Sequence, residues 1–366
     1  MTSVFQLFLR VFVATAVVAG LGLVSPTARG QAAPATVNEA SPAIRGAVYI
    51  PAEAYNAPQM WKNFNVAETR RDFGYAQEIH LNALRLWASY EYWQMEPKHF
   101  KASLDQLLDE AHAHGIRILI SLFENDGVAP TRQNMWTTDP KKAFDVRSPA
   151  LAIASPAHKE RWEKPRGFLK WFMQNYRNDP RLLAIEVMNE PDRVTTPFAE
   201  SMFQTAKSME GRVPLTIGSD GVDHALRFIP LGLDIIEFHV NFPPTRENFE
   251  SEITNAMAVG KQNHLPVWLT EWQRLRPGGS GWGETKIPRA ETVPDYASLA
   301  PIVRQYQIGN FFWSLMVKPA YLPPQRAQGT INGLFLPDGS VWSLNDARAI
   351  ADDPSLDIPE KRILPK

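Results

Sequence analysis

The chain has 366 residues, and its acidic and basic residues nearly balance, so that the formal net charge at pH 7 is −1. This balance leaves no basic field to attract nucleic acid or an anionic membrane surface. The sequence contains no cysteine, which excludes disulfides, thiolate metal sites and a cysteine nucleophile.

Residues 1–35 predict an export signal. Arg10 precedes an apolar run from Val11 to Val24, a length typical of a signal peptide, and small residues suited to cleavage follow it. An uncleaved membrane anchor is the alternative, although the run is short for a membrane span. Cleavage would give a secreted or periplasmic protein without stable membrane association. Residues 31–41 are rich in Ala and Pro and indicate a linker, and residues 36–366 are expected to form one domain.

Strand-like and helix-like segments alternate from this linker to the end of the chain. Short apolar runs predict eight strands, at 43–50, 83–87, 117–123, 182–188, 215–219, 235–240, 266–270 and 310–315. Helical spacing of apolar residues predicts a helix after each strand, at 67–80, 100–114, 158–176, 198–209, 223–228, 247–259, 296–307 and 343–351.

This alternation predicts a parallel sheet whose outer face is covered by helices. Eight units in a chain of this length favour a closed (β/α)8 TIM barrel in a single domain. An open doubly wound sheet is the alternative, and it is disfavoured because no Gly-rich phosphate loop follows the first strand. Two long connections, 124–157 and 273–295, follow the third and seventh strands, on the side where such barrels build active sites.

Polar side chains gather at the predicted C-terminal ends of the strands, which open into one cavity in a barrel. They are Arg85, Glu124, Asn125, Asn189, Glu190, His239, Asn241 and Glu271, together with Trp313 late in the eighth strand. Glu190 follows the fourth strand and Glu271 the seventh, so the two carboxyl groups would face each other across the barrel mouth. Glycosidic cleavage requires such a pair, because one carboxyl protonates the leaving oxygen while the other attacks the anomeric carbon.

Several segments resemble glycoside hydrolase clan A, and within it family 5, the cellulases and mannanases. Ile185–Pro191 contains the Asn-Glu-Pro signature of the fourth strand, and Trp268–Trp272 resembles the segment that bears the nucleophile on the seventh strand. Further similarity lies in Leu81–Trp87, Phe312–Ser314 and Gly333–Phe335, so that the resemblance spans nearly the whole chain after the linker. It implies a (β/α)8 barrel and a retaining O-glycosyl hydrolase.

The resemblance also implies roles for single residues. Glu190 would be the acid/base and Glu271 the nucleophile. Arg85 would pair with Glu271 and keep it ionised. Asn189 would bind the 2-hydroxyl of the sugar, and His239 would bond to the catalytic groups or to the sugar.

Aromatic residues near the strand ends are expected to bind the sugar rings. Trp313 would stack under the ring, and Trp87 and Trp272 are predicted as further substrate-binding residues. The flat apolar faces of Trp93, Trp136 and Trp282 suit a sugar platform, and ordinary packing is the alternative for each.

Two positions depart from the family pattern. Many members have His at the end of the third strand, where this chain has Phe123, Glu124 and Asn125. Many have a Tyr that touches the nucleophile, where this chain has Asn241. We expect Glu124 and Asp126 to belong to a solvated loop, with substrate binding as the alternative.

The predicted function is hydrolysis of a β-linked polysaccharide or oligosaccharide, of the β-glucan or β-mannan type, by double displacement. No cofactor and no metal are required by this chemistry. Two alternatives stay open. One is a carbohydrate-binding barrel without turnover, and the other is an exo-acting clan A glycosidase or transglycosylase whose long loops close one end of the cleft.

Overall fold

Eight parallel strands form the centre of the described chain, which comprises residues 43–276, 281–282 and 292–362 of a computed structural model. They are β1 (Arg45–Val48), β2 (Ala83–Trp87), β3 (Arg117–Ser121), β4 (Leu182–Glu186), β5 (Leu215–Thr216), β6 (Ile236–Asn241), β7 (Val267–Gln273) and β8 (Gly309–Phe312). The pairing order is β5-β4-β3-β2-β1-β8-β7-β6, and all these pairs are parallel. The predicted (β/α)8 barrel is confirmed.

The seam between β5 and β6 is closed without a regular strand ladder. Asp234 provides hydrogen bonds in place of the ladder. Its backbone N–H donates to the Leu215 carbonyl at 3.0 Å, and its carboxylate accepts from the Leu215 N–H at 2.8 Å. The Thr216 hydroxyl donates to the Ile235 carbonyl at 3.0 Å. These bonds satisfy the edge groups that a two-residue strand leaves open.

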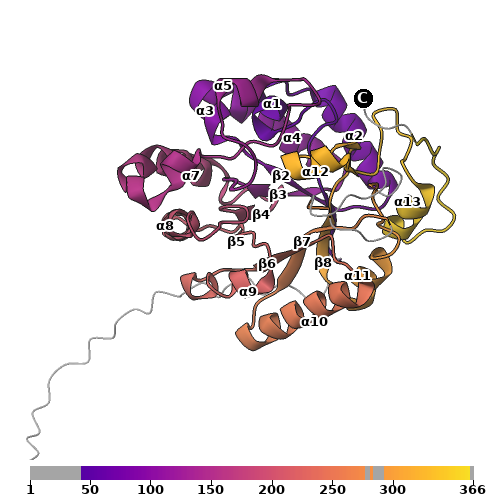
Figure 1. Ribbon diagram of the computed structural model, residues 1–366. Helices are drawn as coiled ribbons and strands as arrows, with labels where there is room; N and C mark the ends of the chain where they lie inside the picture. The colour runs from indigo at the N-terminus through magenta and orange to yellow at the C-terminus, as the bar shows by residue number, and fades with distance from the viewer. Residues whose placement is uncertain (1–42, 277–280, 283–291, 363–366) are drawn as a thin grey trace, which may run out of the picture. The chain divides into compact units, whose positions relative to one another are not determined.

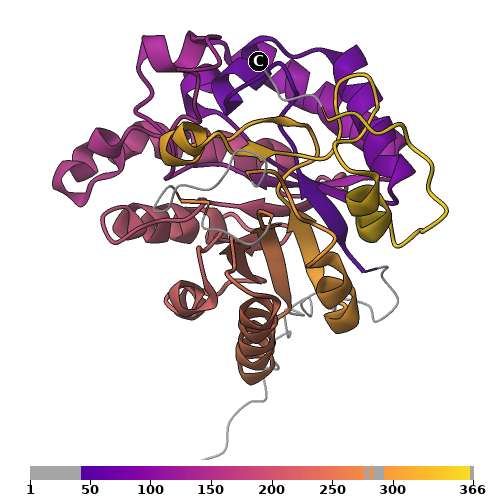
Figure 2. The same cartoon turned by 45° about the vertical axis from the view of Figure 1, so that its right-hand side comes forward.

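Helices surround the strands, as Figures 1 and 2 show. They are α1 (Ala57–Lys62), α2 (Val66–Glu78), α3 (Tyr90–Met95), α4 (Pro97–Ala113), α5 (Arg132–Trp136), α6 (Leu151–Ala154), α7 (Glu163–Tyr176), α8 (Thr196–Lys207), α9 (Val222–Ala225), α10 (Arg246–Asn263), α11 (Ala300–Tyr306), α12 (Pro323–Gln328) and α13 (Leu344–Ala351). Two 3-10 turns, η1 (Pro156–Trp162) and η2 (Ile229–Leu231), and a hairpin of β9 (Lys318–Pro319) and β10 (Ile331–Asn332) complete the described chain.

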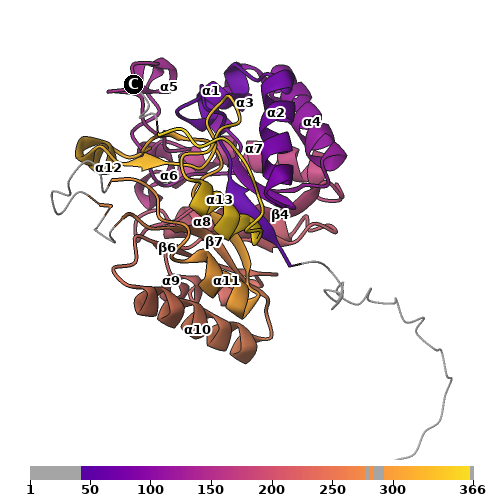
Figure 3. The same cartoon turned by 90° about the vertical axis from the view of Figure 1, so that its right-hand side faces the viewer.

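A helix lies at each of the eight predicted positions, and the additional ones are short elements of the connections. Local sequence sets several of the starts. The side chains of Asn65, Thr245 and Ser343 each accept a backbone N–H in the first turn of α2, α10 and α13, respectively. Figure 3 shows α10 beside the strands, where it packs against β6 and β7.

The core has two layers. A large apolar cluster lies between the strands and the helices. A small cluster fills the interior at the N-terminal ends of the strands, and it includes Ala83, Leu119, Ala184, Ile235 and Phe311. Gly46 makes room for this layer, because a Cβ there would lie 2.3 Å from the Phe311 ring. Because this small apolar cluster fills the N-terminal end of the barrel, polar chemistry is confined to the C-terminal end.

A bulge in β7 decides which of its side chains point inward. Trp268 packs against the interior cluster, whereas Leu269 and Trp272 both belong to the outer core. Strict alternation would place residues three apart on opposite faces. The pairing with β6 instead shifts by one residue after Leu269, so that His239 of β6 faces Glu271. This extra residue turns Glu271 into the barrel and Trp272 out of it.

The predicted signal peptide and linker lie outside the described residues, as does most of the glycine-containing loop after β7. Among the residues that are described, no helix is both long and apolar enough to cross a membrane.

Candidate active site

A pocket opens at the C-terminal ends of the strands. Four of the predicted site residues line it, namely Asn189, Glu190, Glu271 and Trp313. Three further carboxyl groups, those of Glu124, Asp126 and Asp145, line the same pocket. The pocket therefore has a strongly acidic wall.

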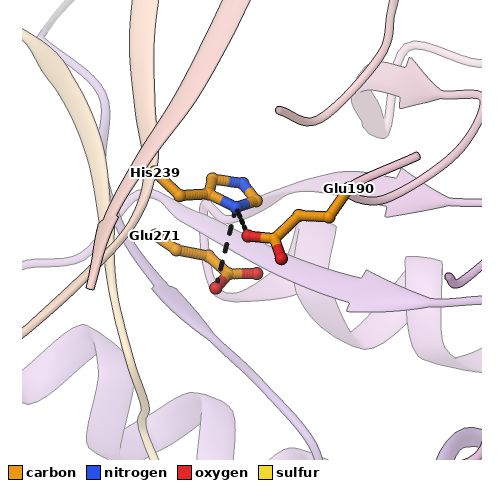
Figure 4. A group of neighbouring side chains, drawn as sticks. All are labelled: Glu190, His239 and Glu271. Carbon is orange, nitrogen blue, oxygen red and sulfur yellow. Dashed lines mark hydrogen bonds and ion pairs between the residues drawn. The ribbon is translucent and has the colours of Figure 1, made fainter. Parts of the chain in front are cut away.

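Glu190 and Glu271 face each other across this pocket, with His239 between them (Figure 4). A carboxylate oxygen of Glu190 lies within 4.8 Å of one of Glu271. The Nδ1 atom of His239 is hydrogen-bonded to Oε1 of Glu190 and lies 3.8 Å from Oε2 of Glu271. The two carboxyl groups, 81 residues apart in the sequence, thus form one centre.

The backbone around Glu190 is fixed by both neighbouring strand ends. Glu190 has a φ of 41°, in the left-handed region that a residue with a side chain seldom adopts. Its N–H donates to the Gly218 carbonyl at 3.0 Å, and the N–H of Asn189 donates to the Phe123 carbonyl at 2.9 Å. These bonds hold the strained conformation and aim the Glu190 side chain at the pocket.

Arg85 lies beneath the pocket and is fully buried. Its Nη1 donates to Oε1 of Glu271 at 2.6 Å, and its Nη2 donates to Oδ1 of Asn189 at 2.7 Å. Its Nε and Nη2 atoms also donate to the two carboxylate oxygens of Glu186, at 2.7 and 2.8 Å. A single guanidinium therefore balances two buried carboxylates, one of them Glu271.

The surroundings set different protonation states on the polar groups. Burial, and after it the negative charges of Glu271 and Asp126, raise the pKa of Glu190 well above its ordinary value. Burial lowers the pKa of Arg85, but the charges of Glu186 and Glu271 outweigh it, so that the pKa is raised and Arg85 stays charged. Glu190 is therefore suited to hold a proton in a centre that also contains an ion pair.

His239 is a neutral partner of Glu190, because burial lowers the pKa of its imidazole. Its Nε2 lies 3.1 Å from the hydroxyl of Thr270, which can donate or accept a hydrogen bond. Nδ1 can accept from protonated Glu190 or donate to ionised Glu190. His239 is 4% exposed and is hydrogen-bonded to carboxyl and hydroxyl groups of the protein, so of its two predicted contacts the structure favours the one to the catalytic groups.

Asn241 takes the position where many family members have Tyr, and it also contacts Glu271. Its Nδ2 donates to Oε2 of Glu271 at 3.1 Å. Its Oδ1 accepts from Nε2 of Gln273 at 3.0 Å, which orients the amide. Both oxygens of Glu271 are thus held, one by Arg85 and one by Asn241.

The expectation that Glu124 lies in a solvated loop is wrong. The side chain is 4% exposed, and both its oxygens accept from Nδ2 of Asn189, at 3.0 and 3.1 Å. The amide of Asn189 is held between Glu124 and Arg85. Asp126 is also not fully solvated, since it is half-buried and lines the pocket.

The predicted aromatic residues divide into two groups. Trp313 lines the pocket just after β8, and its ring packs edge-on against Trp87 at 5.7 Å. Trp282 also lines the pocket, edge-on to Phe242 at 5.2 Å. The substrate-binding prediction for Trp272 is wrong, because the β7 bulge turns its ring into the helix layer, where it is 2% exposed.

The substrate-binding prediction for Trp87 is also wrong. Trp87 is 5% exposed and lies behind the pocket, with the Arg85 guanidinium 4.7 Å from its ring centroid. Arg85 pairs with Glu271 as predicted, and its fully buried guanidinium reaches only protein groups, so it makes no direct contact with substrate. Trp93 and Trp136 pack against the outer apolar core, away from the residues that line the pocket.

Sequence reasoning missed Glu186, which binds Arg85 at two points. Its signal was present, because a carboxylate inside an otherwise apolar strand and four residues before Glu190 requires a buried partner. Gly218 on the neighbouring strand end accommodates it, since a Cβ there would lie 2.5 Å from Oε1 of Glu186.

Glu190, His239 and Glu271 are close enough together to be considered for an ion. The hydrogen bonds from His239 and Asn241 and the ion pair with Arg85 already account for their arrangement. We therefore do not assign this group as a metal site.

Comparison with known proteins connects this geometry to one group of enzymes. No protein-family model matches the chain. The chain is 29% identical over 174 residues to mannan endo-1,4-beta-mannosidase 2 of Oryza sativa subsp. japonica, a match that covers 41% of this chain and 38% of that protein. The chain resembles the glycoside hydrolases of family 5.

Solved structures with the same fold carry related names. The exo-beta-1,4-mannosidase Op5Man5 from Opitutaceae bacterium strain TAV5 has a TM-score of 0.57 at 17% identity, covering 84% of this chain and 58% of that one. A glycoside hydrolase family 5 mannosidase from Rhizomucor miehei has a TM-score of 0.57 at 12% identity, covering 85% and 92%. At these identities the structures show a shared (β/α)8 fold. The chain spans 38% of the rice protein and 58% of the Opitutaceae protein.

Proposed function

We propose that this family 5-like barrel is a retaining glycoside hydrolase that cleaves β-linked mannan-type oligosaccharides or polysaccharides. The observation that supports it is the Glu190–Glu271 pair, whose oxygens come within 4.8 Å of each other in a pocket at the C-terminal end of the barrel. Retaining enzymes have carboxyl groups about 5–5.5 Å apart, whereas inverting enzymes need about 6.5–9.5 Å to admit a water molecule.

In the first step, Glu271 attacks the anomeric carbon while the bond to the leaving oxygen breaks. Glu190 gives its proton to that oxygen, and its raised pKa favours the protonated form that this step requires. The product is a glycosyl ester on Glu271. Arg85 and Asn241 hold the two oxygens of Glu271 and so orient the attacking one.

In the second step, ionised Glu190 takes a proton from water, and the resulting hydroxide attacks the anomeric carbon and releases Glu271. The neutral His239 stays hydrogen-bonded to Glu190 in both protonation states. Trp313 supplies an apolar face for the sugar ring at the pocket wall.

Mannan-type substrates are favoured over glucans because the rice relative is named an endo-1,4-beta-mannosidase and the two structural relatives are named mannosidases. Exo action is the second candidate. The Opitutaceae protein is named an exo-acting enzyme, and Tyr321, Leu322 and Gln325 from the segment after β8 line one side of the pocket. A binding barrel without turnover is disfavoured by the intact carboxyl pair.

The test is hydrolysis of mannohexaose by the wild type and by Glu190→Gln and Glu271→Gln. Each substitution replaces a reacting carboxyl group by an amide of nearly the same size, and we expect kcat to fall by at least about 10³-fold. Glu163→Gln is the matched control, since that side chain is 77% exposed on α7. Product length separates endo from exo action, and proton NMR of the first-formed anomer tests retention. A Gln variant with near-wild-type kcat would end the assignment.

Export through the predicted signal peptide within residues 1–35 is part of this proposal. Expression of the full chain is expected to yield activity in the periplasm or the medium and a shortened N-terminus by mass spectrometry. Activity that remains with the membrane fraction on a full-length chain would instead favour the anchor.

A further inference from the structure

A chain of side-chain hydrogen bonds leads from the proposed nucleophile to the aromatic wall of the pocket, and the chemistry above uses only its last bond. Nδ2 of Asn241 donates to Oε2 of Glu271 at 3.1 Å, and Oδ1 of Asn241 accepts from Nε2 of Gln273 at 3.0 Å. Oε1 of Gln273 accepts from Nδ2 of Asn332 at 3.2 Å, and Oδ1 of Asn332 accepts from Nε1 of Trp313 at 2.9 Å. Three amides therefore connect the Trp313 indole to the carboxylate of Glu271.

All the bonds of this amide chain run in one direction. An indole nitrogen only donates and an ionised carboxylate only accepts, whereas an amide side chain does both. The two ends therefore leave each amide a single orientation, with its oxygen toward Trp313 and its nitrogen toward Glu271. In the other orientation, the oxygen of Asn332 would face only acceptors. Hydrogen bonds aligned in this way polarise one another, so the bond to the charged carboxylate is strengthened by those behind it.

The bulge in β7 that turns Glu271 into the barrel also directs Gln273 to the same side. Residues two apart in a strand point to the same face, so Gln273 follows Glu271 inward. It lies opposite Asn241 in the register of β6 and β7, and the Phe242 N–H donates to its carbonyl at 2.9 Å. The contact between the two amides is therefore a consequence of how these strands pair.

The β9–β10 hairpin holds Asn332 in place behind the pocket wall. Asn332 lies opposite Lys318, whose buried Nζ donates to three backbone carbonyls of the connection after β1 at 2.6–3.1 Å. Gly333 has a φ of 100°, and a Cβ there would lie 2.1 Å from the Met316 carbonyl oxygen. Asn332 is 1% exposed and is not one of the residues that line the pocket, so it can affect a bound sugar only through its neighbours.

We propose that Gln273 and Asn332 are positioning residues, which hold the nucleophile and the Trp313 ring in one fixed arrangement. They act on the nucleophile through Asn241. This inference rests on the proposed function and adds two residues to it.

The amide chain contributes to both steps of the reaction. Trp313 sets where the sugar ring lies, and an oxygen of Glu271 must meet the anomeric carbon of that ring, so their relative position decides the attack distance. In the second step, Glu271 leaves the sugar and regains its negative charge, which the aligned donors of the chain stabilise. No proton moves along the chain, because each amide keeps its hydrogens.

The test is a double-mutant cycle on kcat for mannohexaose, with Asn332→Leu, Asn241→Ala and the double variant. Leu is close to Asn in size but has no donor or acceptor. Asn332→Leu is expected to lower kcat by about 5-fold and Asn241→Ala by about 10-fold. The double variant should stay near about 10-fold, well below the product of about 50-fold, because without Asn241 the chain no longer reaches Glu271. The loosened Trp313 ring should appear separately, as a raised KM in Asn332→Leu.

Asn310→Leu is the matched control. Asn310 of β8 also accepts from an indole, that of Trp272 at 3.0 Å, but its own amide nitrogen donates to the backbone carbonyls of Ile44 and Ile308. The substitution therefore breaks the same kind of bond outside the amide chain, and kcat should stay unchanged. Circular dichroism establishes that each variant is folded, and Asn332→Ser replaces Asn332→Leu in the cycle if the latter is not.

Independent effects of the two substitutions, with a loss near the product in the double variant, would overturn this inference alone. The same holds for an Asn332→Leu variant whose kcat equals that of Asn310→Leu, which is the result expected if Asn332 only supports the hairpin. A wild type that hydrolyses no glycoside would overturn the proposed function as well, so the two failures are distinguishable.

Discussion

Replacing Arg85 by Met is expected to be among the most damaging single changes in the barrel. Its guanidinium makes four hydrogen bonds of 2.6–2.8 Å inside the protein, three to carboxylates and one to Asn189. Met fills much of the same space without charge, so Glu186 and Glu271 would be left buried and close together with no counter-charge.

The magnitude follows from what the substitution leaves behind. Removing one partner of a buried ion pair costs about 3–5 kcal/mol, because the remaining charge stays desolvated. The total stability of a domain is about 5–15 kcal/mol, so this loss is a large share of it. For a domain of this size, about 2 °C per kcal/mol translates it into a fall in Tm of roughly 6–10 °C.

The assay is urea unfolding followed by circular dichroism, with thermal unfolding beside it. Arg70→Met is the matched control: that side chain is 62% exposed and pairs with Glu110 on the surface. We expect the control to leave the stability nearly unchanged, because water screens an exposed ion pair. Arg85→Lys should fall between the two, since Lys retains the charge but not the fork of donors. An Arg85→Met variant as stable as the control would refute the view that a desolvated network governs this site.

Two further substitutions probe the groups around this network. Gly218→Ala would place a methyl group 2.5 Å from a carboxylate oxygen of the ion-paired Glu186 and should destabilise the protein by about 1–3 kcal/mol. Gly74→Ala meets open space within α2 and should stabilise it by about 0.5–1 kcal/mol. Urea unfolding measures both changes, and equal effects would contradict the steric argument. Asn241→Ala removes a hydrogen bond to the charged Glu271 and should lower kcat by about 10-fold, whereas Asn263→Ala at the end of α10 should leave kcat unchanged. A wild-type kcat in Asn241→Ala would show that Arg85 alone orients the carboxylate.

The chain itself determined the barrel and the location of its site. Alternation of apolar strands and helices specifies a parallel sheet covered by helices, because each element must bury its apolar face. In a parallel barrel all strands end at the same rim, so residues that follow the strands, such as Glu190 and Glu271, must meet there. This inference needs only the order of elements, which local patterns reveal.

Only the tertiary structure decided which neighbours these two residues have. The β7 bulge reverses the faces of Glu271 and Trp272, and it depends on register with β6 and β8, which no local pattern encodes. Glu124 and Asp126 have the composition of a solvated loop, but a backbone bond to Ser148 and a side-chain bond from Asn189 hold Glu124 inside the protein. Contacts between residues distant in the chain set these partners, and such contacts are the product of packing.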